Sequence, residues 1–221
     1  MKKILFNDKF GLTQAVLDGS KTQTRRVITY PKTFHGEDVC GYYVCRRATD
    51  RAITEVCMYD ENESFIDEGQ ILPKYKVGEV VAVAQSYCSI AEELENCNNA
   101  TCAAHYEKNV QKASEYIAWM EHPGFNNKMF VAADMMPHKI RITDVRVEKL
   151  QDISDDDCLK EGIEEFPTKS TSSGKAYTFN GINESYKTPR EAFAHLINKV
   201  SRKDIWSENP YVFVYDFELV K

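Results

Sequence analysis

The densest run of side chains that could do chemistry is GSKTQTRR, at positions 19–26. In it a glycine turn is followed by Lys21, Thr22, Thr24, Arg25 and Arg26. A threonine hydroxyl is a weak nucleophile unless a neighbouring base removes its proton. A lysine amine can be that base only if burial or adjacent cations lower its pKa. The run therefore predicts a Lys21–Thr24 nucleophilic pair or a contact for an anion or nucleotide, with a solvated surface turn as the plain alternative.

Spacing alone does not bring Lys21 and Thr24 together. Residues three apart on an ideal strand point to opposite faces, so the turn after Gly19 would have to do so. Residues 4–28 predict a strand, a short helix ended by Gly19, and a second strand carrying the run. The apolar stretch at 76–87 predicts a central strand buried on both faces.

The rest of the chain predicts strands at 39–47, 52–60, 128–134, 138–150 and 209–220, with a surface loop at 60–70. The apolar parity changes along 138–150, which predicts a bulge near Thr143–Asp144. Ser154 and Thr188 are N-cap residues that predict the starts of two helices, and residues 105–120 predict a third. The elements do not alternate as βαβα, so the pattern predicts an α+β fold with a largely antiparallel or barrel-like sheet.

Composition limits the classes of function. The 221 residues include 28 Lys and Arg against 34 Asp and Glu, giving a formal net charge of −6. An acidic chain does not favour a broad surface that neutralises phosphates, so any basic patch must be local. The sequence contains no run of 18 apolar residues, so it predicts no membrane-spanning helix. Asp8 and Lys9 interrupt the apolar start, which predicts a cytoplasmic protein rather than an exported one.

The spacing of the cysteines gives a weaker signal, for a metal site. The chain has seven cysteines, and both Cys40/Cys45 and Cys97/Cys102 are separated by four residues. Structural zinc sites usually use closer pairs and four ligands, so reduced thiols are the preferred interpretation. We predict no metal and no cofactor, and a metal site at Cys97, Cys102 and His105 is left open.

The run GSKTQTRR resembles the G-x-K-T-x-T-x-R signature of the ASCH-domain family, a branch of the PUA-like β-barrels. Three later segments resemble further blocks of this family in the right order: VGEVVAVAQSY, ITDVRVEKLQDISDDDCLKEGI and IWSENPYVFVYDFELV. The four blocks cover residues 4–28, 78–87, 138–166 and 205–219, and they look most like longer, phage-type members.

The resemblance implies one PUA-like (ASCH) domain over residues 1–221, a small, largely antiparallel β-barrel with flanking helices that binds nucleotides or RNA. It implies long insertions at about 29–75, 88–137 and 167–188. One branch of the family is a bacterial 4-acetylcytidine amidohydrolase, which is distantly similar to this chain. Its proton acceptor, nucleophile and proton donor correspond to Lys21, Thr24 and Glu161, and its signature arginine corresponds to Arg26.

The substrate-binding residues that we expect beside this triad are Arg25, Arg26, Thr22 and Gln85. Glu161 ends the helix that Ser154 begins, where the negative end of the helix dipole opposes ionisation of a carboxyl group. A carboxyl that stays protonated suits a general acid. The chain departs from longer relatives at Ala84 and Gln85, which stand where those relatives have Arg-Glu.

Three functions follow as hypotheses. The first is an amide hydrolase acting on an acylated or modified nucleoside, and the second is a non-catalytic module that binds RNA or a nucleotide. Arg46, Arg47 and Arg51, near Tyr42 and Tyr43, are a second cationic cluster of the kind that suits single-stranded nucleic acid. The third is a phage-derived accessory protein whose insertions bind another protein. The sequence leaves the oligomeric state open.

Overall fold

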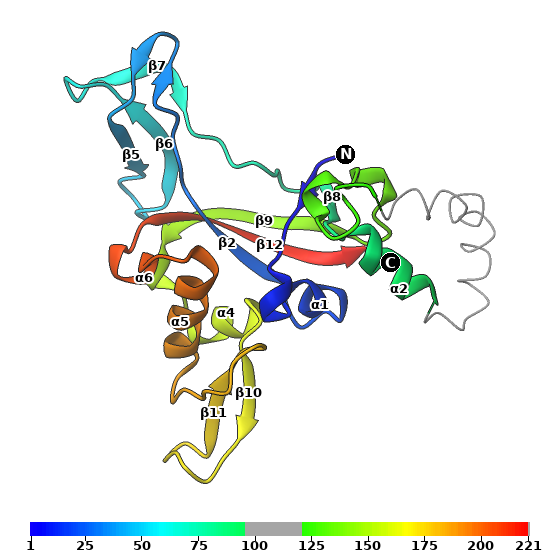
Figure 1. The fold of residues 1–221 in the computed structure, drawn as a ribbon. Coiled ribbons are helices and arrows are strands. Elements are labelled where there is room, and N and C mark those ends of the chain that lie inside the picture. Colours follow the sequence, from blue (N-terminus) through cyan, green and yellow to red (C-terminus); the bar gives the residue numbers. More distant parts are fainter. Residues whose placement is uncertain (96–120, 221) are drawn as a thin grey trace.

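The computed structural model describes residues 1–95 and 121–220, and its architecture is mixed α+β with mostly antiparallel sheets and a few helices (Figure 1). The main sheet has five strands in the order β1-β8-β9-β12-β2, and β1 pairs with β8 in parallel. Its strands are β1 (Lys3–Ile4), β2 (Gln23–Val27), β8 (Val80–Val83), β9 (Lys139–Lys149) and β12 (Tyr211–Val220). β8 lies between β1 and β9, and Val81, Ala82 and Val83 are all buried, which confirms a strand buried on both faces, although it covers Val80–Val83 rather than 76–87 and lies beside the edge strand.

The long antiparallel pair β9–β12 forms the middle of this sheet. Asp144 pairs with Asp216, but Ile142 pairs with Phe217, so Thr143 is an extra residue on β9. This register shift confirms the predicted bulge, and it explains why the apolar parity changes there: one extra residue turns every later side chain to the other face.

The two outer strands of the main sheet are bridged by a side chain. Arg26 on β2 donates a hydrogen bond from Nη2 to the carbonyl oxygen of Leu5, which follows β1, at 2.5 Å. The sheet therefore curves enough for a side chain of one outer strand to reach the segment that follows the other. Among the described strands no backbone pairing joins β1 to β2, so complete closure into a barrel stays a prediction.

Helices pack beside β2 and against one another (Figure 1). They are α1 (Leu12–Leu17), α4 (Asp155–Lys160), α5 (Pro189–Ser201) and α6 (Ile205–Glu208), while α2 (Tyr87–Glu95) follows β8. The Ser154 hydroxyl accepts a hydrogen bond from the Asp157 amide at 3.1 Å, and Thr188 forms a capping box with Glu191. Both predicted helix starts are confirmed.

Smaller sheets stand away from the main one (Figure 1). One has three strands, and the other two are hairpins. Their strands are β5 (Gly41–Arg46), β6 (Ile53–Tyr59) and β7 (Phe65–Gln70); β3 (Thr33–Phe34) and β4 (Glu37–Asp38); β10 (Glu164–Pro167) and β11 (Lys175–Thr178). The expected insertion at 29–75 thus contains β3 to β7, and the one at 167–188 contains β11.

Two local predictions were wrong. Residues 65–70 form β7 rather than a surface loop, because they pair with β6 in antiparallel register, with Ile66 as the one large apolar side chain of β7 that is buried. Residues 128–134 are not a strand, since short 3-10 turns cover Lys128–Phe130 and Ala133–Met135. The helix predicted at 105–120 lies outside the described residues.

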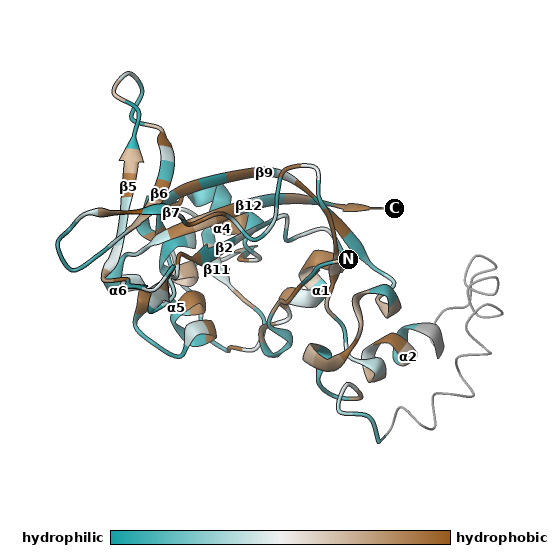
Figure 2. Cartoon of the chain, turned by 90° about the horizontal axis from the view of Figure 1, so that it is seen from above, coloured by the Kyte–Doolittle hydropathy of each residue, from teal (hydrophilic) through white to brown (hydrophobic). Residues whose placement is uncertain are grey.

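The main core joins side chains from Ile4 to Phe217. Along β9 apolar and polar segments alternate, as Figure 2 shows, which is the pattern of a strand whose two faces have different surroundings. No helix in the described part of the chain is long and apolar enough to cross a membrane.

Candidate functional site

Lys21 is a buried cation held by three acceptors. Its side chain is only 1% exposed, and Nζ donates to Glu161 Oε2 at 2.6 Å, to the Glu161 carbonyl at 2.7 Å and to the Gln23 carbonyl at 2.8 Å. Gly19 adopts a φ of 82°, and the Lys21 amide then donates to the Ala15 carbonyl at 2.8 Å. This turn, which α1 anchors, directs Lys21 towards the end of α4.

Glu161 is the C-cap residue of α4 and bridges two cations. One carboxylate oxygen accepts from Lys21, and the other accepts from Nη1 of Arg25 at 3.1 Å. The carboxylate therefore joins the Lys21 amine to the Arg25 guanidinium. Gly162 follows with a φ of 99°, and a side chain there would approach Leu12 and Lys21.

One face of the sheet carries a wider ion network that reaches α4. Arg25 Nη2 contacts Glu148 at 2.6 Å and Asp157 at 3.3 Å, and Arg146 contacts Asp157 at 3.2 Å. Arg146 also pairs with Asp216, to which Gln23 donates a hydrogen bond. Strand pairing explains the cluster, because Gln23 and Arg25 on β2 lie beside Asp216 and Val214 on β12 and share one face with them.

The network has clear electrostatic consequences. Burial lowers the pKa of Lys21, and the charges of Arg26 and Arg25 lower it further, while Glu161 opposes the shift. Burial alone would raise the pKa of Asp157, but Lys160, Arg25 and Arg146 outweigh it and lower that pKa. The pKa of Lys21 is lowered, which is the direction that a lysine base requires. The causes, burial and the neighbouring arginines, are those that the sequence analysis named as conditions.

The opposite face of the same strands borders a cleft of about 300 Å³. Arg26, Phe213 and Tyr215 point to this face, and Tyr75 and Lys74 line it from the segment before β8. Arg26 and Lys21 both lie near the ring of Phe6, at 5.7 and 5.8 Å from its centroid. The cleft therefore offers cations and aromatic rings, and the Phe6 ring connects its Arg26 to Lys21.

The structure brings Lys21, Glu161 and Arg25 into direct contact, but it does not join the other predicted residues to them in the same way. Thr24 is buried and pairs with Tyr215 on the cleft side, and its hydroxyl makes no hydrogen bond among the described residues. Thr22 contributes its backbone, whose amide donates to the Lys160 carbonyl at 2.9 Å. The assignment of roles to these residues stays a prediction.

Gln85 lies beyond β8, buried, and donates from Nε2 to Glu93. In the described part of the chain its Oε1 is the buried side-chain atom left without a hydrogen bond. An unsatisfied buried acceptor costs free energy and calls for an explanation, and a ligand donor would supply one.

Sequence reasoning missed the acidic partners Glu148, Asp157 and Asp216, and the cleft residues Tyr75 and Lys74. Glu148 and Asp216 lie on segments that were predicted to be strands, and carboxylates within strands of a core sheet were an available signal, because buried carboxylates need partners. The carboxylates at this site are paired with Arg or Lys, so they do not form a metal-ligand set. The cysteine–histidine group that was left open, Cys97, Cys102 and His105, lies outside the described residues.

No family model matches this chain, and neither a curated protein nor a solved structure matches it. The functional argument therefore rests on the sequence and on the geometry above.

Proposed function

We propose that this protein is a nucleotide-binding module of the ASCH type, which takes a nucleoside, a nucleotide or a short RNA segment in the Arg26 cleft. One observation carries the proposal: Arg26, with the rings of Tyr75, Tyr215 and Phe213, lines a cleft, and the Phe6 ring lies near both this guanidinium and the buried amine of Lys21. The family assignment and the PUA-like barrel belong to this proposal, supported by the GSKTQTRR run and by the Arg26–Leu5 bridge between the outer strands.

The chemistry of the cleft suits a small anionic ligand with an aromatic base. Aromatic side chains stack on bases at about 1–3 kcal/mol per base, and guanidinium and ammonium groups pair with phosphates. A volume of about 300 Å³ lies at the lower end of small-molecule sites, about 300–1,000 Å³. The acidic net charge of −6 also favours a single nucleotide over a long nucleic-acid surface.

The same geometry favours a binding function over a catalytic one. Lys21 already donates to three acceptors, and Glu161 accepts a hydrogen bond from Arg25 as well. To serve as base and acid, Lys21 would first transfer a proton to Glu161, giving a neutral amine and a neutral carboxyl group. The lowered pKa of Lys21 favours that step, but the Arg25 contact opposes it.

Titration calorimetry with cytidine monophosphate and with a short oligoribonucleotide tests binding. We expect affinity that falls as salt concentration rises, and a loss of about tenfold for Lys74→Gln, which removes a cation at the rim of the cleft. Lys203→Gln, an exposed lysine that does not line the cleft, is the matched control. Equal affinity in all three proteins would remove the cleft from the proposal.

The amidohydrolase remains a second candidate because the Lys21–Glu161 contact joins two of its three predicted residues. In that reaction Thr24 Oγ1 attacks the acyl carbon, Lys21 accepts its proton and Glu161 protonates the leaving amine. Water then hydrolyses the acyl-threonine ester, which releases the carboxylic acid and restores the Thr24 hydroxyl. Thr24→Val keeps the shape of the side chain but removes the hydroxyl, and Thr24→Ser keeps the hydroxyl. Turnover of 4-acetylcytidine should survive in Thr24→Ser and vanish in Thr24→Val; turnover by Thr24→Val would exclude the threonine nucleophile.

A further inference from the structure

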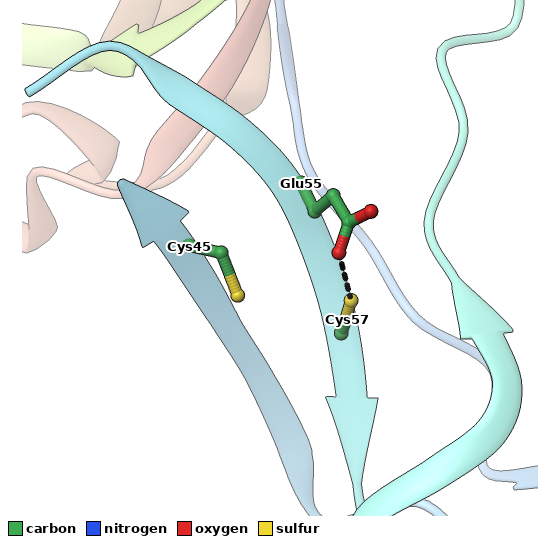
Figure 3. Close-up of side chains that lie close together, drawn as sticks. All are labelled: Cys45, Glu55 and Cys57. Atoms are coloured by element: carbon green, nitrogen blue, oxygen red, sulfur yellow. Dashed lines mark hydrogen bonds between the residues drawn. The ribbon is translucent and has the colours of Figure 1, made fainter. Parts of the chain in front are cut away.

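A second cluster of reactive side chains lies on the three-stranded sheet, away from the Lys21 pair. Figure 3 shows Cys45 on β5 with Glu55 and Cys57 on β6, all turned towards one another. Cys45 pairs directly with Glu55 in the antiparallel register, and Cys57 is two residues further along the same strand. Alternation along a strand places residues two apart on the same face, so the register gathers all three on one face.

The distances suit coordination of one cation. The two sulfur atoms and a carboxylate oxygen all lie within 4.8 Å of one another, and Cys57 Sγ is 3.8 Å from Glu55 Oε2. Zinc bonds of about 2.3 Å to sulfur and 2.0 Å to oxygen in a tetrahedron separate those ligand atoms by about 3.5–3.8 Å. Small side-chain rotations are therefore enough to close the site.

The strand register also favours a metal site over a disulfide between Cys45 and Cys57. Cys45 faces Glu55, so Cys57 is its diagonal neighbour. Diagonal residues on antiparallel strands have Cα atoms about 7–8 Å apart, whereas disulfides span about 4.4–6.8 Å. A cation between the sulfur atoms bridges the longer distance without movement of the backbone.

A neighbouring strand supports the carboxylate. Gln70 on β7 pairs with Cys57 in the register, and its Nε2 donates to Glu55 Oε1 at 3.5 Å. Such a contact orients a ligand and leaves the second carboxylate oxygen, on the cysteine side, for the cation. Cys45 and Cys57 are partly exposed and Glu55 is exposed, so solvent reaches the site.

We propose that Cys45, Cys57 and Glu55 bind a divalent cation of the zinc class, with a fourth position open to water or to an incoming ligand. Two thiolates select a borderline-soft cation over Mg²⁺ or Ca²⁺. Three protein ligands with one open position differ from the closed four-ligand sites of structural zinc. This site revises the prediction of a chain without metal and replaces the Cys40/Cys45 spacing, because residues five apart on a strand face opposite ways.

Cobalt titration of the reduced full-length protein tests the site, since Co²⁺ in a thiolate site gives a near-ultraviolet charge-transfer band. We expect one equivalent of Co²⁺ with that band, displaced by Zn²⁺. Cys45→Ser and Cys57→Ser should each lose this equivalent, and Glu55→Gln should weaken its binding by at least the roughly 10–100-fold that loss of a hydrogen-bond partner of a ligand costs.

Cys40→Ser is the matched control, because it removes an exposed thiol from the same region. The double variant Cys97→Ser/Cys102→Ser separates any cobalt bound at that cysteine pair. Both controls should keep the equivalent assigned to Cys45 and Cys57. The proposal is overturned if Cys45→Ser and Cys57→Ser bind Co²⁺ as the wild type does, if the wild type binds none, or if mass spectrometry finds Cys45 and Cys57 joined as a disulfide after mild purification.

Discussion

Replacing Lys21 with methionine should destabilise the protein strongly. The change keeps most of the apolar stem but removes the ammonium group that faces Glu161 Oε2 at 2.6 Å. It also removes the donor to two backbone carbonyls, those of Gln23 and Glu161. The carboxylate of Glu161, 6% exposed, then keeps Arg25 alone as its cationic partner.

The expected loss follows from this arrangement. Removing one partner of a buried ion pair costs about 3–5 kcal/mol, because the remaining charge is left without compensation. Arg25 still neutralises part of the Glu161 charge, so we expect about 3 kcal/mol for Lys21→Met. For a chain of this length that corresponds to a fall in Tm of about 6–12 °C.

Urea unfolding followed by circular dichroism measures this loss at neutral pH, together with Glu161→Gln and the double variant. The double variant should lose less than the sum of the single losses, by about 1 kcal/mol or more, because the two side chains interact directly. Lys160→Met is the control: its exposed ion pair with Asp157 should contribute at most about 1 kcal/mol. Losses below about 1 kcal/mol in both Lys21→Met and Glu161→Gln would refute a buried, desolvated pair.

The pH dependence gives an independent check of the same pair. Because burial lowers the pKa of Lys21 below 10.5, the folded protein binds fewer protons than the unfolded chain in the window just below that value. This group therefore makes stability rise with pH through the window and level off above 10.5. Lys21→Met should lose that contribution, and an unchanged slope would contradict a desolvated amine.

Three further outcomes follow from single residues. Burial raises the pKa of Tyr75 to about 12, so between pH 10 and 12 this group makes the folded state less stable; Tyr75→Phe should flatten that part of the urea-midpoint profile, and an identical profile would contradict it. Ser154→Ala removes the cap of α4 and should cost about 1 kcal/mol in urea unfolding, whereas Ser170→Ala, in an exposed loop, should cost almost nothing. Gly162→Ala, at a φ of 99° and with Leu12 close by, should cost about 1–2 kcal/mol and lower Tm; no change would show that this turn is not strained by a side chain.

Local signals in the sequence predicted much of the main sheet. The parity change near Thr143 located the bulge, and Ser154 and Thr188 located helix starts, because capping and strand alternation act over a few residues. The strand β7 was missed because its side chains are mostly polar, with Ile66 alone packing inwards among its large apolar residues. Residues 128–134 were wrongly predicted as a strand, since a short apolar run also fits a segment of 3-10 turns in which only Val131 is buried.

The candidate site likewise has features that the sequence could predict and features that it could not. The cationic neighbours of Lys21 could be inferred from positions 19–26, which are adjacent in the chain, whereas its burial could not. The contact with Glu161 spans 140 residues and depends on how α1 and α4 meet, so spacing could not provide it. The cluster of Cys45 and Cys57 was hidden for a related reason: the register of β5 and β6 joins them, and the conspicuous Cys40/Cys45 spacing pointed elsewhere.

The bridge from Arg26 to the Leu5 carbonyl makes one side chain serve two purposes. The same guanidinium joins the margins of the sheet and lines the cleft. Any ligand that engages it therefore acts on the closure of the sheet as well, so occupancy of the cleft and the shape of the sheet are thermodynamically linked. A substitution of Arg26 consequently changes affinity and shape at once, and a residue such as Lys74, which contributes to the cleft alone, is needed to separate recognition from architecture.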